Sequence, residues 1–189
     1  MRVLNLNLFD PLVRLVTTAG TPVRLSPYQV ATTIAFTRNT GGTEDTITDS
    51  ASGFLVAGFQ VGDFVTIAGT TNNNTTTGYE IVTVASGTLT LRVSGQLTTE
   101  AAGASVTLDT LHGLKVPDGV EVAIRSRIGN TGVITVAPTS ARAVNTVTGY
   151  QRHTRIESNQ SVSVQVRNLK DLWCDSTVSG EGVEILFER

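Results

Sequence analysis

The chain has 189 residues and a mass of 20.0 kDa, enough for one domain or two small ones, and its 40% hydrophobic content is enough to bury a core. Charged residues make up only 16% and the net charge is -2, which argues against electrostatic capture of nucleic acid or of an anionic membrane. Threonine accounts for about one residue in six, beside abundant valine and glycine, so the composition predicts an all-β protein.

The N-terminal segment, residues 1–31, alternates apolar and polar residues before a break at Pro11. Leu4, Leu6 and Leu8 share one face of an extended chain, followed by Phe9. One interpretation is an extended N-terminal arm that pairs with another subunit, because a lone strand leaves its backbone groups unsatisfied; these four residues are then the partner-binding residues. The other interpretation, of equal weight, is an ordinary first strand of the same domain.

Targeting and membrane signals are weak. The N-terminal residues are interrupted by Asn5, Asn7 and Asp10, which makes a poor signal peptide. No apolar run approaches the roughly 20 residues that a spanning helix needs. The sequence therefore predicts a protein without membrane partners that folds in a cytoplasm.

Residues 32–110 read as a small, threonine-rich, barrel-like β module. Val61, Phe64 or Val65, and Ile67 are predicted to face its core, and Ser86-Gly87 is predicted to join two strands as a hairpin. The polar run from Thr70 to Gly78 falls between two strands, and we interpret it as a solvent-facing loop tip, because Asn and Thr hydrogen-bond their own backbone in turns.

Residues 111–189 read as a C-terminal antiparallel β-sandwich or jelly-roll. Val120, Val122 and Ile124 alternate with polar or small residues, and two more strands are predicted around the turn at 179–182. The alternation leaves open whether 32–110 precedes this sandwich or is inserted into one that the N-terminal strands begin.

No pattern of residues predicts catalysis, a metal site or a cofactor. His112 and His153 lack partners at metal-ligand spacing, and the acidic residues near turns are more typical of turn formers; the best carboxylates are Glu44, Asp45, Asp49, Asp171, Asp175, Glu181 and Glu184. The single cysteine, Cys174, is interpreted as a small buried residue and Trp173 as a core residue, with a partner contact as its alternative.

The C-terminal module carries an N-T-G-x-I-x-V strand at residues 130–136, a Ser-Val segment at 149–164 and a closing N-L-x-D-L segment at 168–183, with Asn159-Gln160 before the Ser-Val strand. These motifs resemble those of structural proteins in tailed-bacteriophage virions, although a glycine is expected where Asn159-Gln160 stands. The phrase F-x-V-G-D-x-V-T-I-x-G-T-x-N-N, at residues 59–73, is similar to that of small β domains in phage virion proteins. The two similarities cover roughly 80% of the chain.

This resemblance implies a non-enzymatic capsid decoration, or cement, protein. Such a protein binds the major capsid protein on the outer surface of the head as a homotrimer, after synthesis in the host cytoplasm, and needs no cofactor. One alternative is a neck, tail or baseplate component. The alternative of another class is a carbohydrate-binding attachment module, which would use the exposed aromatic residues among Tyr28, Tyr79, Tyr150 and Trp173.

Overall fold

The computed structural model describes residues 12–111, 113, 115–144 and 154–188, and it confirms that the chain is all-β. The chain divides into two compact units. Unit 1 comprises residues 27–113, and unit 2 comprises the described residues before and after it. The helices of the described part are single turns: α1 (Phe54–Ala57), α2 (Ser140–Ala143) and the 3-10 turn η1 (Leu169–Asp171).

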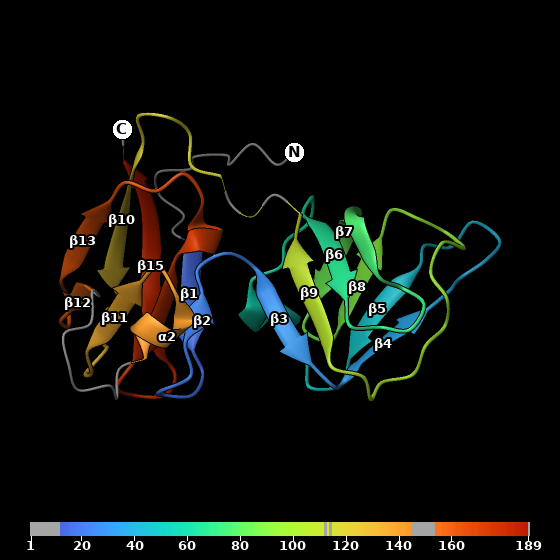
Figure 1. Cartoon of the computed structure of the whole chain (residues 1–189), viewed down its shortest axis with the longest axis horizontal. Helices are drawn as coiled ribbons and strands as arrows, with labels where there is room; N and C mark the ends of the chain where they lie inside the picture. The colour runs from blue at the N-terminus through green and yellow to red at the C-terminus, as the bar shows by residue number, and fades with distance from the viewer. Residues whose placement is uncertain (1–11, 112, 114, 145–153, 189) are drawn as a thin grey trace. The chain divides into compact units, whose positions relative to one another are not determined.

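Unit 1 is built on one seven-stranded antiparallel sheet, in the order β3-β9-β6-β7-β8-β5-β4 (Figure 1). In chain order its strands are β3 (Tyr28–Ala31), β4 (Ile34–Thr37), β5 (Thr46–Asp49), β6 (Phe64–Ala68), β7 (Thr75–Ala85), β8 (Thr88–Leu91) and β9 (Val106–Thr110). The predicted Ser86-Gly87 hairpin is confirmed, since β7 and β8 pair on either side of it.

The sheet of unit 1 curls until its two end strands approach each other. β3 and β4 stand at opposite ends of the strand order, yet only Thr32 and Thr33 connect them. The segment before β9 occupies the gap, where the backbone N–H and C=O groups of Phe36 and Glu100 exchange hydrogen bonds of 2.9 and 3.0 Å. A hydrogen bond of 2.8 Å from Gly103 N to Thr32 O continues this closure. The sheet therefore encloses its core as a small barrel does.

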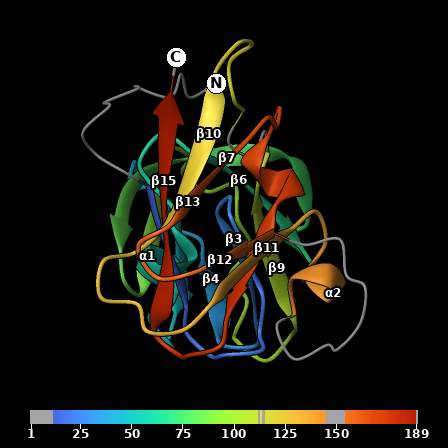
Figure 2. The ribbon, with the colours of Figure 1, turned by 90° about the vertical axis from the view of Figure 1, so that its left-hand side faces the viewer.

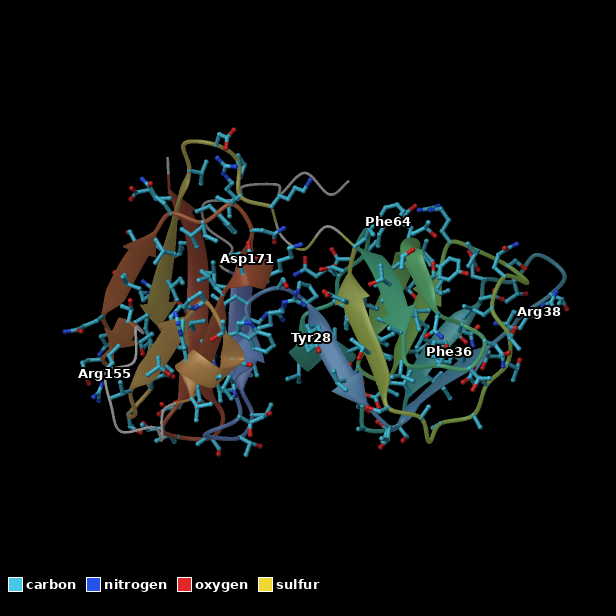
Figure 3. All side chains as sticks on the ribbon, viewed as in Figure 1. Tyr28, Phe36, Arg38, Phe64, Arg155 and Asp171 are labelled. Carbon is cyan, nitrogen blue, oxygen red and sulfur yellow. The ribbon has the colours of Figure 1, made fainter. Side chains whose placement is uncertain are left out.

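The core of unit 1 collects the inward positions of these strands. Val65 and Ile67 are buried as predicted, but Val61 is 59% exposed, because the glycine turn at Gly62 (φ +87°) precedes β6 and leaves Val61 outside the strand. Figure 3 shows the same division at the other end of the sheet, where Phe36 lies inside unit 1 and Arg38 projects from the loop after β4.

Unit 2 contains two four-stranded antiparallel sheets. One has the order β1-β15-β10-β13 and the other β12-β11-β14-β2. The strands are β1 (Leu12–Val16), β2 (Val23–Arg24), β10 (Glu121–Ser126), β11 (Ile134–Ala137), β12 (Thr154–Ile156), β13 (Ser161–Val164), β14 (Trp173–Ser176) and β15 (Glu181–Glu188). Figure 2 shows the central strands β10 and β15 running side by side.

The two sheets of unit 2 share one core. Val122, Ile124 and Ile185 contribute from the first sheet, and Ile134 and Val136 from the second. Antiparallel sheets that face each other over a common core form a sandwich. The predicted alternation in β10 holds for Val122 and Ile124, although Ala123 between them is also buried, at 4% exposure.

The N-terminal residues that the structure describes are strands of these units. β1 pairs with β15, from Leu12 opposite Ile185 to Val16 opposite Glu181, and β2 pairs with β14. Residues 12–26 of the expected 1–31 arm therefore belong to unit 2, and residues 27–31 belong to unit 1. Unit 1 is thus inserted between the first two strands of unit 2 and the rest of it.

Candidate functional site

Asp45, one of the predicted carboxylate candidates, organises a loop of unit 1. Its side chain is fully buried and accepts backbone hydrogen bonds from Asn39 (2.7 Å), Gly95 (3.0 Å), Gln96 (2.8 Å) and Leu97 (2.8 Å). Burial opposes ionisation, but the N–H donors, led by Leu97, outweigh it and hold the pKa of Asp45 below its usual value. This carboxylate therefore holds two loops together.

Asp49, the last residue of β5, is also a buried acceptor of several hydrogen bonds. It accepts hydrogen bonds from the Thr33 hydroxyl (2.5 Å), the Gln29 amide (2.8 Å) and the backbone N–H groups of Ala51 and Gly53 (2.9 Å each). Burial opposes ionisation of this group too, but the donors, with Thr33 first, lower the pKa of Asp49. The carboxylate caps the turn that leads into α1.

Glu181 is the corresponding group in unit 2. Only 8% of it is exposed, and it accepts hydrogen bonds from Thr131 N, Gly132 N and the Ser176 hydroxyl. These donors, led by Thr131, outweigh the cost of burial and lower the pKa of Glu181. Within the described ranges no group of three or more His, Cys, Asp or Glu side chains is placed to hold a metal ion.

Much of the polar run after β6 is exposed, and the side chains of Thr70 and Asn74 hydrogen-bond the backbone of the run, as predicted, but part of the run is buried. Asn73 is only 5% exposed, because its amide donates to Thr98 O (2.9 Å) and to the Glu100 carboxylate (3.1 Å). The backbone N–H groups of Thr71 and Asn72 also donate to Glu100, and these bonds, with that of Thr71 largest, lower the pKa of Glu100. Residues 75–78 of the run are part of β7. The burial of Asn73 was not predictable from the run itself, because the acceptors of its amide lie about 25 residues downstream.

Cys174 and Trp173, adjacent in β14, differ in burial. Cys174 is fully buried, as predicted, and burial raises the pKa of its thiol to about 12. Trp173 is half-buried and outside the core, so the core interpretation was wrong. The Arg24 guanidinium lies 5.9 Å from its ring centroid, which is within the range of a cation–π contact.

One side of the sheet of unit 1 carries an array of threonines, which we call the threonine face. It consists of the outward-pointing residues of the adjacent strands β4, β5, β8 and β7: Ala35, Thr37, Thr46, Thr48, Thr83, Ala85, Thr88 and Thr90. Their neighbours along each strand, such as Phe36, Ile47 and Leu89, point into the core. The face is therefore the outer side of one sheet.

Strand register arranges the threonine face in two rows. Thr46 lies opposite Thr37 on one side and opposite Thr90 on the other, and Thr90 lies opposite Thr83. The second row repeats this order with Ala35, Thr48, Thr88 and Ala85. Neighbours in a row are about 4.8 Å apart, and the rows are about 6.8 Å apart.

The chemistry of this face is uniform and uncharged. The Thr83 hydroxyl donates to the Thr90 hydroxyl at 2.6 Å, so two neighbours within the first row are linked by a hydrogen bond. A charged pair lies beside the end of the array, where Arg92 Nε contacts Glu80 Oε2 at 2.8 Å. β-branched side chains have few rotamers to lose, so a partner would order them at low entropic cost.

The threonine face was not predictable from the sequence, because alternation assigns the outward residues of each strand but does not show which strand lies beside it. The predicted partner-binding residues Leu4, Leu6, Leu8 and Phe9 lie outside the described residues, as do His112, His153 and Tyr150. Of the aromatic residues considered for glycan binding, Tyr79 packs against the unit 1 core and Trp173 contacts Arg24.

Comparison of the chain with protein-family models, with curated proteins and with solved structures found no match. Among the described residues, no helix is both long and apolar enough to span a membrane.

Proposed function

We propose that this protein is a non-enzymatic structural protein of a tailed-bacteriophage virion, which binds the outer surface of the head as a homotrimer and stabilises the major capsid lattice. The motif resemblance at residues 59–73, 130–136 and 168–183 supports the assignment to virions. The observation that supports a structural binding role is the threonine face.

The threonine face has the properties of a surface that stays in contact with another protein. Charged residues are depleted at the centres of protein interfaces, and the eight residues of this face include none, although the pair Glu80 and Arg92 lies beside it. Its hydroxyls can donate and accept, and its methyl groups can be buried with little loss of side-chain entropy. A large, pre-ordered, neutral surface suits a partner that presents the same face many times, as a capsid lattice does.

The N-terminal residues Leu4, Leu6, Leu8 and Phe9 supply the second contact of the proposal. They precede β1, which is an end strand of its sheet. An apolar stripe attached to an end strand can add to a neighbouring subunit. Contacts that form only on the assembled lattice then stabilise the shell by mass action, because they are absent from free capsid subunits.

Binding to undecorated heads tests the proposal. Purified protein is mixed with heads and measured by co-sedimentation and electron microscopy, with the double variant Thr46→Lys/Thr90→Lys to charge the threonine face. The matched control is Thr107→Lys, an outward position of β9 elsewhere on the same sheet. We expect ordered, stoichiometric decoration by the unchanged chain and by the control, and about tenfold or weaker binding by the double variant.

Two results would overturn the proposal. Absence of the unchanged protein from the head lattice, with rings at the neck or tail in its place, would assign it to those structures. Equal binding by the double variant and the control would remove the threonine face from the contact. Binding to a glycan array in the absence of heads would favour the attachment module.

A further inference from the structure

A groove opens at one end of unit 2, where two chain segments separate after the last pair of a ladder. β10 and β13 remain paired as far as Val122 and Val164. Beyond that pair, residues 116–121 and 165–167 diverge around a cavity of about 440 Å³. The segments meet again where Val116 N donates to Arg167 O at 2.9 Å. We call this feature the end groove.

The end groove is elongated and has an apolar floor. A second cavity of about 380 Å³ shares Val116, Asp118 and Arg167 with the first and extends it toward Lys115. Val116 and Val120 belong to the core of unit 2 and are 7% and 6% exposed. Cavities of this size are typical of ligand sites.

The rim of the end groove carries both charges and amides. Gln165 Nε2 donates to Glu121 Oε1 at 3.2 Å across the opening. Lys115, Asp118 and Arg167 are exposed, and within the described part of the chain their side chains form no ion pair. An occupant therefore needs apolar groups for the floor and hydrogen-bonding or charged groups for the rim.

The N-terminal sequence of this chain has that composition. Leu4, Leu6 and Leu8 alternate with Asn5 and Asn7, which places apolar side chains on one side of an extended segment and amides on the other. Asp10, directly after the segment, is opposite in charge to Lys115 and Arg167, which leave that end of the rim with a net positive charge beside Asp118. The segment is uncharged from residue 3 to residue 9, as a valine floor requires.

The register of the first sheet limits how much of the segment a chain could place in its own groove. Leu12 lies opposite Ile185, which lies opposite Ile124, so β1 is two strands away from β10 and begins three residues short of Glu121. Two strand spacings of about 4.8 Å and three residues of about 3.4 Å each place Leu12 about 14 Å from Glu121, at the near rim of the groove. A fully extended chain from Leu12 reaches about 14 Å at Leu8, about 20 Å at Leu6 and about 27 Å at Leu4. Leu6 and Leu4 could therefore reach the groove of their own chain, but Leu8 could reach no further than its rim.

We propose that the end groove of unit 2 binds residues 4–9 of a second copy of this chain. A neighbouring copy can bring all of Leu4, Leu6 and Leu8 over the valine floor, which the chain's own segment cannot. The amides of Asn5 and Asn7 then hydrogen-bond the rim. The inference rests on the proposed self-association but not on binding to capsids.

Cysteine cross-linking between two different chains tests this exchange in solution without heads. One chain carries Leu8→Cys, and the other carries Gln165→Cys at the rim of the groove. Cys174 is fully buried, so it leaves the engineered pair undisturbed. After mixing and mild oxidation, we expect the mixed disulfide dimer to form at least about tenfold faster than with Val61→Cys, an exposed position of unit 1 that serves as the matched control.

Two outcomes would overturn the inference: a mixed dimer that forms no faster than with the control, or an intramolecular disulfide in the double variant Leu8→Cys/Gln165→Cys with no mixed dimer. Sedimentation of Leu6→Asp provides a second measurement, for which we expect self-association about tenfold weaker than that of the unchanged chain. Cross-linking without head binding would contradict the proposed function alone, whereas head binding with cross-linking at the control rate would contradict the exchange alone.

Discussion

The carboxylate of Asp45 accepts a hydrogen bond of 2.8 Å from the backbone N–H of Leu97, although 52 residues separate them in the chain. Three further backbone N–H groups, of Asn39, Gly95 and Gln96, converge on the same side chain. One buried acceptor thus positions the loop after β4 and the loop after β8.

Replacing this acceptor should destabilise unit 1 strongly. We expect Asp45→Ala to lower the free energy of unfolding by about 3–4 kcal/mol, because buried N–H groups lose their partner. Urea unfolding measures the change, and Glu44→Ala, at an exposed neighbour, should stay within about 0.5 kcal/mol of the unchanged chain. Similar losses in the two variants would mean that the loops satisfy their N–H groups without Asp45.

Acid should unfold the protein through the carboxylates whose pKa values are lowered, which include Asp45, Asp49 and Glu181. The unfolded chain binds more protons than the folded chain between the lowered values and the ordinary values of 3.8 for Asp and 4.5 for Glu. Their stabilisation is therefore complete above about pH 5 and is lost as the pH falls through the lowered values.

The measurement is the urea midpoint at pH 7, 5, 4 and 3. We expect a plateau between pH 7 and 5 and a decline below it. Asp45→Asn should show a shallower decline, because one of the titrating groups is gone. Equal midpoints at pH 7 and pH 3 would show that these carboxylates do not couple folding to protons.

Cys174 should be almost inert toward thiol reagents in the folded chain. Its thiol pKa is raised from 9.0 to about 12, so the thiolate population at pH 8 falls roughly a thousandfold, and burial adds a barrier to the reagent. The rate of alkylation at pH 8 should rise by at least that factor in denaturant. Rapid alkylation of the native protein, while its circular dichroism is unchanged, would contradict the buried placement.

A side chain at Gly182 should separate β1 from β15. A Cβ atom there would overlap the backbone carbonyl of Arg14 and lie 2.9 Å from Leu15 Cα, and a backbone cannot rotate away as a flexible side chain can. We expect Gly182→Ala to cost about 3 kcal/mol or more in thermal or urea unfolding. Gly129→Ala, where the added Cβ meets nothing within 4 Å, should cost only the strain of its positive φ, about 1–2 kcal/mol. A smaller loss at Gly182 than at Gly129 would contradict this close approach.

Residues 27–113 should fold when produced alone. Unit 1 has its own core, and its two ends are held beside each other by the pairing of Tyr28 with Asp109. We expect cooperative thermal unfolding and the circular dichroism of a β protein. The same fragment with Asp45→Ala serves as a destabilised comparison, and a non-cooperative transition in the unchanged fragment would show that unit 1 depends on the rest of the chain.

The alternation of apolar and polar residues predicted which residues of a strand face the core, but it did not predict which strands pair. Val122 and Ile124 in β10, and Leu89 and Leu91 in β8, face the core because a period of two assigns residues to faces. The period does not name the neighbouring strand, so the pairing of β1 with β15, at opposite ends of the chain, was not predictable. For the same reason the threonine face was missed.

The insertion of unit 1 also sets an order of events during synthesis. β1 leaves the ribosome before unit 1 does, whereas β15, which lies between β1 and β10 in the sheet, leaves after it. Unit 1 is complete long before that, so it can fold on the nascent chain while β1 waits for its partner. A chain truncated before Glu181 would contain a finished unit 1 and a unit 2 in which β15 no longer joins β1 to β10.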